Sequence, residues 1–190
     1  MIDPGHGGSD KGSVLGSGVT EKQVTLAFAR ELRKELAERG IACRLIRDSD
    51  VPVSLDKRAE IANEQRPFLY VSIHAAAGPS SIRVYSPYLS KPSSPPGLFV
   101  NWNSAQFPVL ERSTAVARSV SRELQRKNIR VVGLSAALRP LIHITAPAIA
   151  IELAVPSHSA ATLLTEKFDN PIATAVAIAI NQGHATGGQP

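Results

Sequence analysis

The sequence predicts a single α/β domain with a largely parallel sheet and helices on both faces. Segments with strand patterns alternate with helical segments along the chain, which is the order that produces parallel sheets. Residues 68–73 form a mostly apolar run, as expected for a central strand that is buried on both faces. The 190 residues also fit one domain.

The first predicted strand is short and ends in a glycine-rich turn. Pro4 cannot donate a backbone hydrogen bond and therefore ends the strand, and Gly5, Gly7 and Gly8 let the chain turn around His6. Because so few residues precede His6, we expect this end of the chain to be weakly anchored.

The next element is an amphipathic helix with clear ends. Thr20 and Gln23 form a capping box, apolar residues follow at helical spacing as far as Leu36, and Gly40 ends the helix. A second helix begins after Ser54. The remaining predicted elements are strands over residues 41–46, 68–73, 82–88 and 147–151, and helices over 110–126, 159–168 and 171–182.

Two segments lie outside this alternating pattern. Residues 89–108 are rich in proline and serine, which predicts a long surface excursion. Residues 184–190 are polar and glycine-rich and predict a flexible C-terminal tail. The predicted domain therefore covers residues 1–183.

Composition excludes several classes of protein. The formal charge of +5 could favour polyanions, but the basic residues are dispersed on helices between carboxylates, and no nucleic-acid-binding motif accompanies them. No run approaches the roughly 20 apolar residues of a membrane span. Cys43 is the only cysteine, so the chain has no internal disulfide and no thiolate zinc cluster.

Three chemically active side chains follow predicted strands. His6 follows the first strand, His74 follows residues 68–73, and Glu152 follows residues 147–151. In largely parallel sheets the functional site lies beyond the carboxyl ends of the strands. We therefore expect these three residues to meet at one edge of the sheet.

These residue types fit a hydrolytic zinc site. Catalytic zinc takes three protein ligands from histidine and carboxylate and keeps a fourth position open. Glu21, at the first turn of a capped helix, is the natural third ligand beside His6 and His74, because the helix N-terminus stabilises its charged form. Glu152, which is costly to bury without a task, would serve as the general base.

Each residue also has a structural alternative. Glu21 could simply interact with the helix dipole, and His74 could be a core histidine bonded to the backbone. Glu152 could pair with an arginine such as Arg47 or Arg58. His143 lies in an apolar stretch, where a structural role is the commoner one.

The ordered set of motifs resembles the zinc-dependent N-acetylmuramoyl-L-alanine amidases that cut bacterial peptidoglycan. The resemblance covers nearly the whole chain and is carried by the set rather than by any single fragment. The matching fragments are residues 2–8, 21–22, 47–50, 55 with 58 and 62–63, 71–75, 113 with 117, and 147–152.

The resemblance implies a six-stranded sheet and a zinc ion held by His6, Glu21 and His74, with Glu152 as the catalytic glutamate. The bond cut would join N-acetylmuramic acid to L-alanine of the stem peptide. The partners would be peptidoglycan and muropeptides, with a regulatory protein as a further candidate. The enzyme would act as a monomer in the periplasm or outside the cell, although no export signal is visible at the start of this chain.

The chain departs from the family pattern near the substrate. The family usually carries asparagine two residues after the second histidine, where Ala76 stands here, and often an arginine where residues 141–145 stand. Two rival interpretations stay open. One is a peptidoglycan-binding module with little turnover, and the other is a zinc peptidase that acts on the stem peptide.

Overall fold

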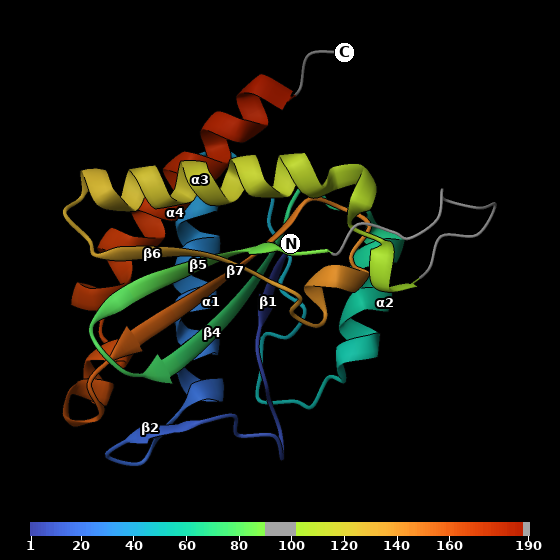
Figure 1. Ribbon diagram of the computed structural model, residues 1–190. Coiled ribbons are helices and arrows are strands. Elements are labelled where there is room, and N and C mark those ends of the chain that lie inside the picture. The colour runs from blue at the N-terminus through green and yellow to red at the C-terminus, as the bar shows by residue number, and fades with distance from the viewer. Residues whose placement is uncertain (90–101, 188–190) are drawn as a thin grey trace.

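The computed structural model describes residues 1–89 and 102–187 (Figure 1). The strands are β1 Ile2–Pro4, β2 Val14–Gly16, β3 Val19–Thr20, β4 Tyr70–Ala77, β5 Ser81–Pro87, β6 Val131–Ala136 and β7 Ala148–Val155. The α-helices are α1 Glu21–Glu38, α2 Leu55–Gln65, α3 Leu110–Arg126 and α4 Glu166–Gly187. Short 3-10 helices are η1 Trp102–Ser104, η2 Phe107–Val109, η3 Leu141–His143 and η4 Ser157–Leu164.

The central sheet has five strands in the order β1-β4-β7-β5-β6. β1, β4 and β7 run parallel to one another, and β5 and β6 also pair in parallel. Only the pairing of β5 with β7 is antiparallel. The predicted α/β class with a mostly parallel sheet is confirmed.

The two faces of the sheet carry different side chains, because β7 alternates between large apolar residues on one face and alanines and Glu152 on the other. Ile149, Ile151 and Leu153 point to one face, where they join the main core. Ala148 and Ala150 point to the opposite face. This period of two is the pattern of a strand whose two faces meet different surroundings.

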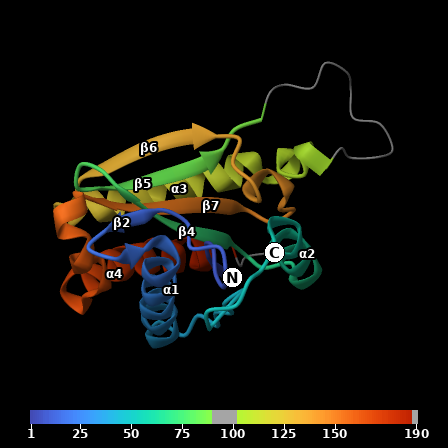
Figure 2. The same cartoon turned by 90° about the horizontal axis from the view of Figure 1, so that it is seen from below.

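Helices cover the two faces unequally. The main core packs α1, α3 and α4 against one face, and Figure 2 shows α1 and α4 side by side with α2 standing apart from them. The other face is covered over one end only, where Ala59 and Ala62 of α2 pack with Tyr70 and Leu141. Among the described residues, no further helix packs on the rest of that face, which carries the candidate site.

The sheet has one strand fewer than the resemblance implied. The segment predicted as a strand over residues 41–46 makes a single parallel bridge between Leu45 and Ile2. The structure also contains strands that the sequence did not predict. These are the edge strand β6 and the short hairpin of β2 and β3. The hairpin lies in a stretch whose glycine and serine content indicated only a loop.

Most predicted helices are confirmed, and the C-terminal pair is corrected. α1 begins after Thr20, whose capping box with Gln23 is present, and Ser54 accepts a hydrogen bond from the Lys57 amide at the start of α2. The predicted helix over 159–168 is the 3-10 helix η4 followed by the first turn of α4. Pro171 is the sixth residue of α4, so the helix lacks the backbone hydrogen bond that an amide at this position would donate to the carbonyl of Lys167.

The two segments outside the alternating pattern are only partly visible. Residues 90–101 of the proline-rich excursion and residues 188–190 of the tail lie outside the described residues. The described end of the excursion forms η1 and η2, and α4 includes residues 184–187. Within the described parts of the chain, no helix has the length and apolarity needed to cross a membrane.

Candidate metal centre

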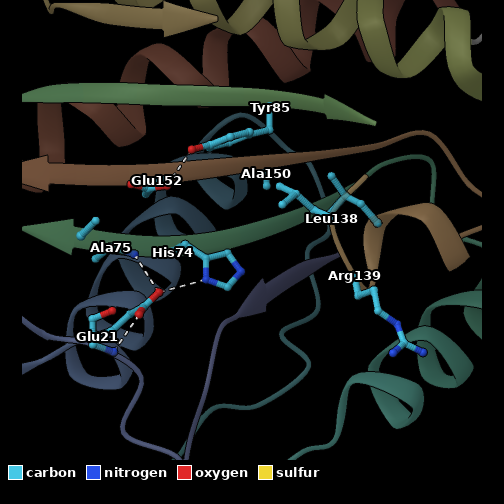
Figure 3. A pocket seen from close by; sticks show the side chains of 11 residues that line it. Glu21, His74, Ala75, Tyr85, Leu138, Arg139, Ala150 and Glu152 are labelled. Carbon is cyan, nitrogen blue, oxygen red and sulfur yellow. Dashed lines mark hydrogen bonds and ion pairs between the residues drawn. The ribbon is translucent and has the colours of Figure 1, made fainter. Parts of the chain in front are cut away.

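A cavity of about 280 Å³ lies on the open face of the sheet (Figure 3). Glu21 and His74 line it at one side, Glu152 and Tyr85 lie on its floor, and Arg139 lines it at the other side. Small side chains such as those of Ala76 and Ala150 leave the space that the cavity occupies.

Three of the predicted site residues converge beside this cavity, and two of them, Glu21 and His74, line it. One ligand atom from each of His6, Glu21 and His74 lies within 4.8 Å of the other two. They come from the turn after β1, the first residue of α1 and the middle of β4. The structure therefore brings together the three side chains predicted as zinc ligands, and their role as ligands stays a prediction.

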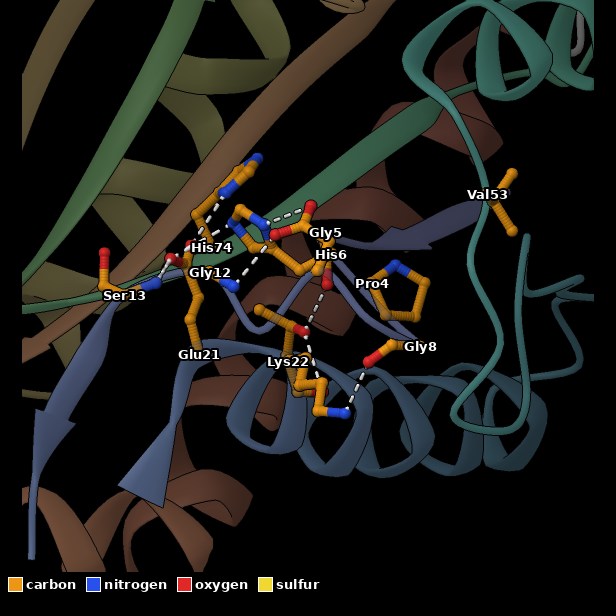
Figure 4. Close-up of polar contacts among 12 residues, drawn as sticks. Pro4, Gly5, His6, Gly8, Gly12, Ser13, Glu21, Lys22, Val53 and His74 are labelled. Carbon is orange, nitrogen blue, oxygen red and sulfur yellow. Dashed lines mark hydrogen bonds and ion pairs between the residues drawn. The ribbon is translucent and has the colours of Figure 1, made fainter. Parts of the chain in front are cut away.

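Glu21 is the centre of this cluster (Figure 4). Its Oε1 lies 2.9 Å from Nδ1 of His74, and its Oε2 lies 3.1 Å from Nε2 of His6. The amides of Ala75 and Ser13 also donate hydrogen bonds to the two oxygens, at 3.2 and 3.0 Å. Although burial opposes ionisation, the hydrogen bonds from His6, His74 and Ser13 hold the pKa of Glu21 well below its usual range.

Asp10 orients the imidazole of His6. Nδ1 of His6 lies 2.9 Å from Oδ2 of Asp10, which leaves Nε2 directed at Glu21. The hydrogen bond with Glu21 raises the pKa of His6 against the opposing effect of burial, and Asp10 contributes further. A carboxylate that holds the far nitrogen of a histidine in this way is the usual partner of a metal-ligating imidazole.

Arg58 anchors the turn that carries His6. Its side chain, 3% exposed, forms an ion pair with Asp3 and donates hydrogen bonds to the carbonyls of Pro4 and His6 at 2.8 and 2.7 Å. His6 itself has a left-handed backbone with φ of 62°, which a non-glycine residue adopts only when its surroundings hold it there.

Arg47 holds the same turn from another side. Its guanidinium donates to the carbonyls of Pro4 and Gly5 at 3.0 and 2.8 Å, and to the Lys22 carbonyl at 2.9 Å. The expectation of a weakly anchored end was therefore wrong. β1 is short and can form few backbone hydrogen bonds, but two buried arginines hold the turn that follows it.

Gly5 lets the turn pass close to His74. A Cβ at this position would stand 2.9 Å from Cε1 of His74 and 2.8 Å from the Ile73 carbonyl oxygen. Any side chain here would displace the histidine from Glu21.

His74 and Glu152 do not lie beyond the strand ends, as the sequence predicted. Each is the fifth residue of an eight-residue strand, and the two are register partners across β4 and β7. The strands extend four residues further than the apolar runs suggested, and the open-face positions after His74 and Glu152 are alanines. The site is consequently built on the face of the sheet and not at its edge.

Glu152 is paired, but with neither Arg47 nor Arg58. Arg83 donates to its Oε1, and the hydroxyl of Tyr85 donates to its Oε2 at 2.8 Å. Burial, followed by the hydrogen bond with Glu152, raises the pKa of Tyr85 to about 12, so its hydroxyl remains a donor. These two residues were missed because only the pairing of β5 with β7 places them beside Glu152.

His143 lies outside the metal cluster, in agreement with its structural interpretation. It is fully buried in η3, and its Nε2 lies 3.0 Å from Oδ1 of Asn103. Its ring packs against Trp102, with ring centroids 5.0 Å apart. Burial lowers the pKa of His143.

A family model described as N-acetylmuramoyl-L-alanine amidase matches residues 1–182. A 75-residue stretch is 45% identical to N-acetylmuramoyl-L-alanine amidase AmiA of Salmonella typhimurium, covering 40% of this chain and 26% of that protein. An 80-residue stretch is 44% identical to the sporulation-specific N-acetylmuramoyl-L-alanine amidase of Bacillus subtilis, covering 41% of this chain and 31% of that protein. The chain thus spans only part of the length of these relatives.

The fold is similar to that of solved amidases over almost its whole length. The crystal structure of N-acetylmuramoyl-L-alanine amidase from Clostridium difficile 630 superposes with a TM-score of 0.77 at 24% identity, covering 98% of this chain and 96% of that one. At this identity the likeness concerns the fold alone.

Proposed function

Because the chain belongs to the N-acetylmuramoyl-L-alanine amidase family, we propose that it is a zinc-dependent hydrolase of peptidoglycan. The bond cut is the amide between N-acetylmuramic acid and L-alanine of the stem peptide. One observation carries the proposal. Glu21 and His74 of the candidate metal cluster line the same cavity as Glu152, so a metal site and a candidate base face the same substrate volume.

The residues present fit zinc. Two imidazoles and one carboxylate make up a donor set used by catalytic zinc, and the low pKa of Glu21 keeps that carboxylate in its ligating form. When bound, zinc supplies Lewis acidity toward the scissile carbonyl and toward water. Asp10 then acts on the site from outside by fixing the ring of His6.

Glu152 supplies the proton transfer in this proposal. It stands beside His74 in the sheet register, and its side chain is 15% exposed at the cavity floor. Its carboxylate accepts a proton from the attacking water and donates it to the leaving amine of L-alanine. This route needs no further acid, because one carboxylate acts in both steps.

The far side of the cavity suits a peptide that carries carboxylates. Arg139 is the one Lys or Arg side chain among the described residues that line it, and it is 58% exposed. Its contact with Asp56 is loose, at 3.9 Å. A stem peptide could therefore pair a carboxylate with this guanidinium. Action on peptidoglycan places the protein in the cell envelope, in the periplasm or outside the cell.

The product identifies the reaction. We expect the purified, zinc-loaded protein to release intact stem peptides from muropeptides, as read by mass spectrometry, and to stop doing so after chelation. Glu152→Gln should bind zinc as the wild type does but lose at least about a hundredfold in kcat, because the proton transfer is gone.

Other products would favour the rival functions. Shortened stem peptides still attached to N-acetylmuramic acid would indicate a zinc peptidase. Binding of peptidoglycan without any product would indicate a binding module. Full activity in Glu152→Gln would exclude the assigned role of Glu152.

A further inference from the structure

Three polar residues stand in one row across the open face of the sheet. Glu152 on β7 is the register partner of His74 on β4 and, on its other side, of Arg83 on β5. Neighbouring strands lie about 4.8 Å apart, so the side chains in such a row are within reach of one another. The row runs from the candidate metal ligand through the candidate base to a cation.

Both oxygens of Glu152 are held from β5. Arg83 forms an ion pair with Oε1, and Tyr85, two residues further along the same face, donates to Oε2 at 2.8 Å. Ala150 is the register partner of Tyr85, and its small side chain leaves room for the phenol ring to lean toward Glu152 (Figure 3). Two side chains of one strand thus bind the two oxygens of the carboxylate.

We propose that Arg83 and Tyr85 are positioning residues that fix the carboxylate of Glu152 for proton transfer. This inference rests on the proposed function of the site. A carboxylate has two oxygens and about four lone-pair sites, so one donor on each oxygen leaves room for a water molecule. The two contacts therefore restrict the rotation of the carboxylate without occupying it.

The arrangement separates positioning from substrate binding. Arg83 is not among the residues that line the cavity, and its side chain is 26% exposed. Loss of its guanidinium should leave the substrate contacts intact while freeing the Glu152 side chain to rotate. A displacement of about 1 Å at a reacting group is enough to cost about a hundredfold in rate.

Arg83→Gln and Tyr85→Phe test the proposal directly. We expect kcat for stem-peptide release to fall by about ten- to a hundredfold in Arg83→Gln and less in Tyr85→Phe, with bound zinc unchanged in both and KM unchanged in Arg83→Gln. Arg83→Lys should recover part of the loss, because it restores the charge without the fork of donors. Arg118→Gln removes an exposed arginine of α3 and serves as the matched control with unchanged kcat.

A double-mutant cycle separates positioning from a merely structural contribution. In a Glu152→Gln background, adding Arg83→Gln should cause no further loss of kcat, because its effect passes through the carboxylate. Equal losses in both backgrounds would overturn the proposal. So would an unchanged kcat in Arg83→Gln when Glu152→Gln is inactive.

Crystal structures of the wild type and Arg83→Gln give a readout that does not depend on turnover. We expect the Glu152 carboxylate to be rotated or split between conformers in the variant. An unchanged, single Glu152 conformer would overturn the positioning role even if the wild type proved to lack amidase activity. A wild type that releases no stem peptide would count against the proposed function alone.

Discussion

The backbone at Gly12 passes close to the candidate metal centre. Its φ is +63°, in the region that favours glycine. A Cβ there would stand 2.6 Å from Cδ2 of His6 and 2.8 Å from Oε2 of Glu21. Even the smallest side chain would therefore press on two of the three candidate ligands.

We expect Gly12→Ala to weaken zinc binding and to lower kcat/KM by at least tenfold. The added methyl group must displace His6 or Glu21, and the left-handed backbone adds a strain of about 1 kcal/mol. Zinc affinity can be measured by competition with a chelating dye, and activity by stem-peptide release.

Gly133→Ala provides the control for this substitution. Gly133 lies in β6, and a Cβ there would meet no atom within 4 Å. The same chemical change should leave zinc binding and activity unaltered. If Gly12→Ala bound zinc as tightly as Gly133→Ala does, the close approach of the loop would not matter to the site.

At the residue scale, the sequence predicted the side chains that meet in the candidate site but not those that hold them. His6, Glu21, His74 and Glu152 were predicted because their residue types limit what they can do at strand and helix ends. Arg83 could not be predicted, because its pairing with Glu152 depends on β5 running antiparallel to β7. That register is a property of the assembled sheet and leaves no local signal.

At the scale of elements, local signals predicted the helices better than the ends of the strands. The capping box at Thr20 and the apolar periodicity of residues 110–126 are short-range patterns, and both helices form where expected. The end of β7 was placed too early because Glu152 interrupts an apolar run. The alternation of small and large residues continues past it to Val155.

α4 carries a buried acid that the sequence analysis did not single out. Asp169 is 4% exposed, its Oδ1 has no hydrogen-bond partner among the described residues, and it lies near Glu31 of α1. Burial, assisted by Glu31, raises the pKa of Asp169 to about 7. The folded protein therefore binds a proton at this site between pH 4 and 7, whereas the unfolded chain does not.

We expect the free energy of unfolding to fall as the pH rises from 4 to 7 because of this group. Ionising Asp169 in the folded protein costs up to about 4 kcal/mol. This loss of stability is complete above pH 7 and absent below pH 4. Asp169→Asn should thus be more stable than the wild type at pH 8 and no more stable at pH 4. Urea unfolding of the chelated proteins at both values measures this difference.

Asp56→Asn is the matched control for the pH experiment. Asp56 is 79% exposed, so its removal should not change the pH dependence of stability beyond a few tenths of a kcal/mol. A wild type and an Asp169→Asn variant with parallel stability curves from pH 4 to 8 would contradict the account of α4.

At the scale of the whole molecule, the candidate site joins segments that are far apart in the chain. His6, Glu21 and His74 lie after β1, at the start of α1 and within β4, so their donor atoms converge only when the sheet and α1 are assembled. The unfolded chain cannot offer the same geometry. A metal ion that binds this set should therefore bind the native state far more tightly than the unfolded state.

We expect zinc to raise the melting temperature of the chelated protein for this reason. Free zinc at 1,000 times its Kd contributes about 4 kcal/mol, which in a domain of this size corresponds to about 10 °C. Glu21→Gln should lose most of the shift, because its carboxylate links both histidines. Glu152→Gln should keep it, because this residue is not part of the donor set. Equal melting temperatures with and without zinc would show that the three side chains do not form a metal site, whatever the activity of the protein.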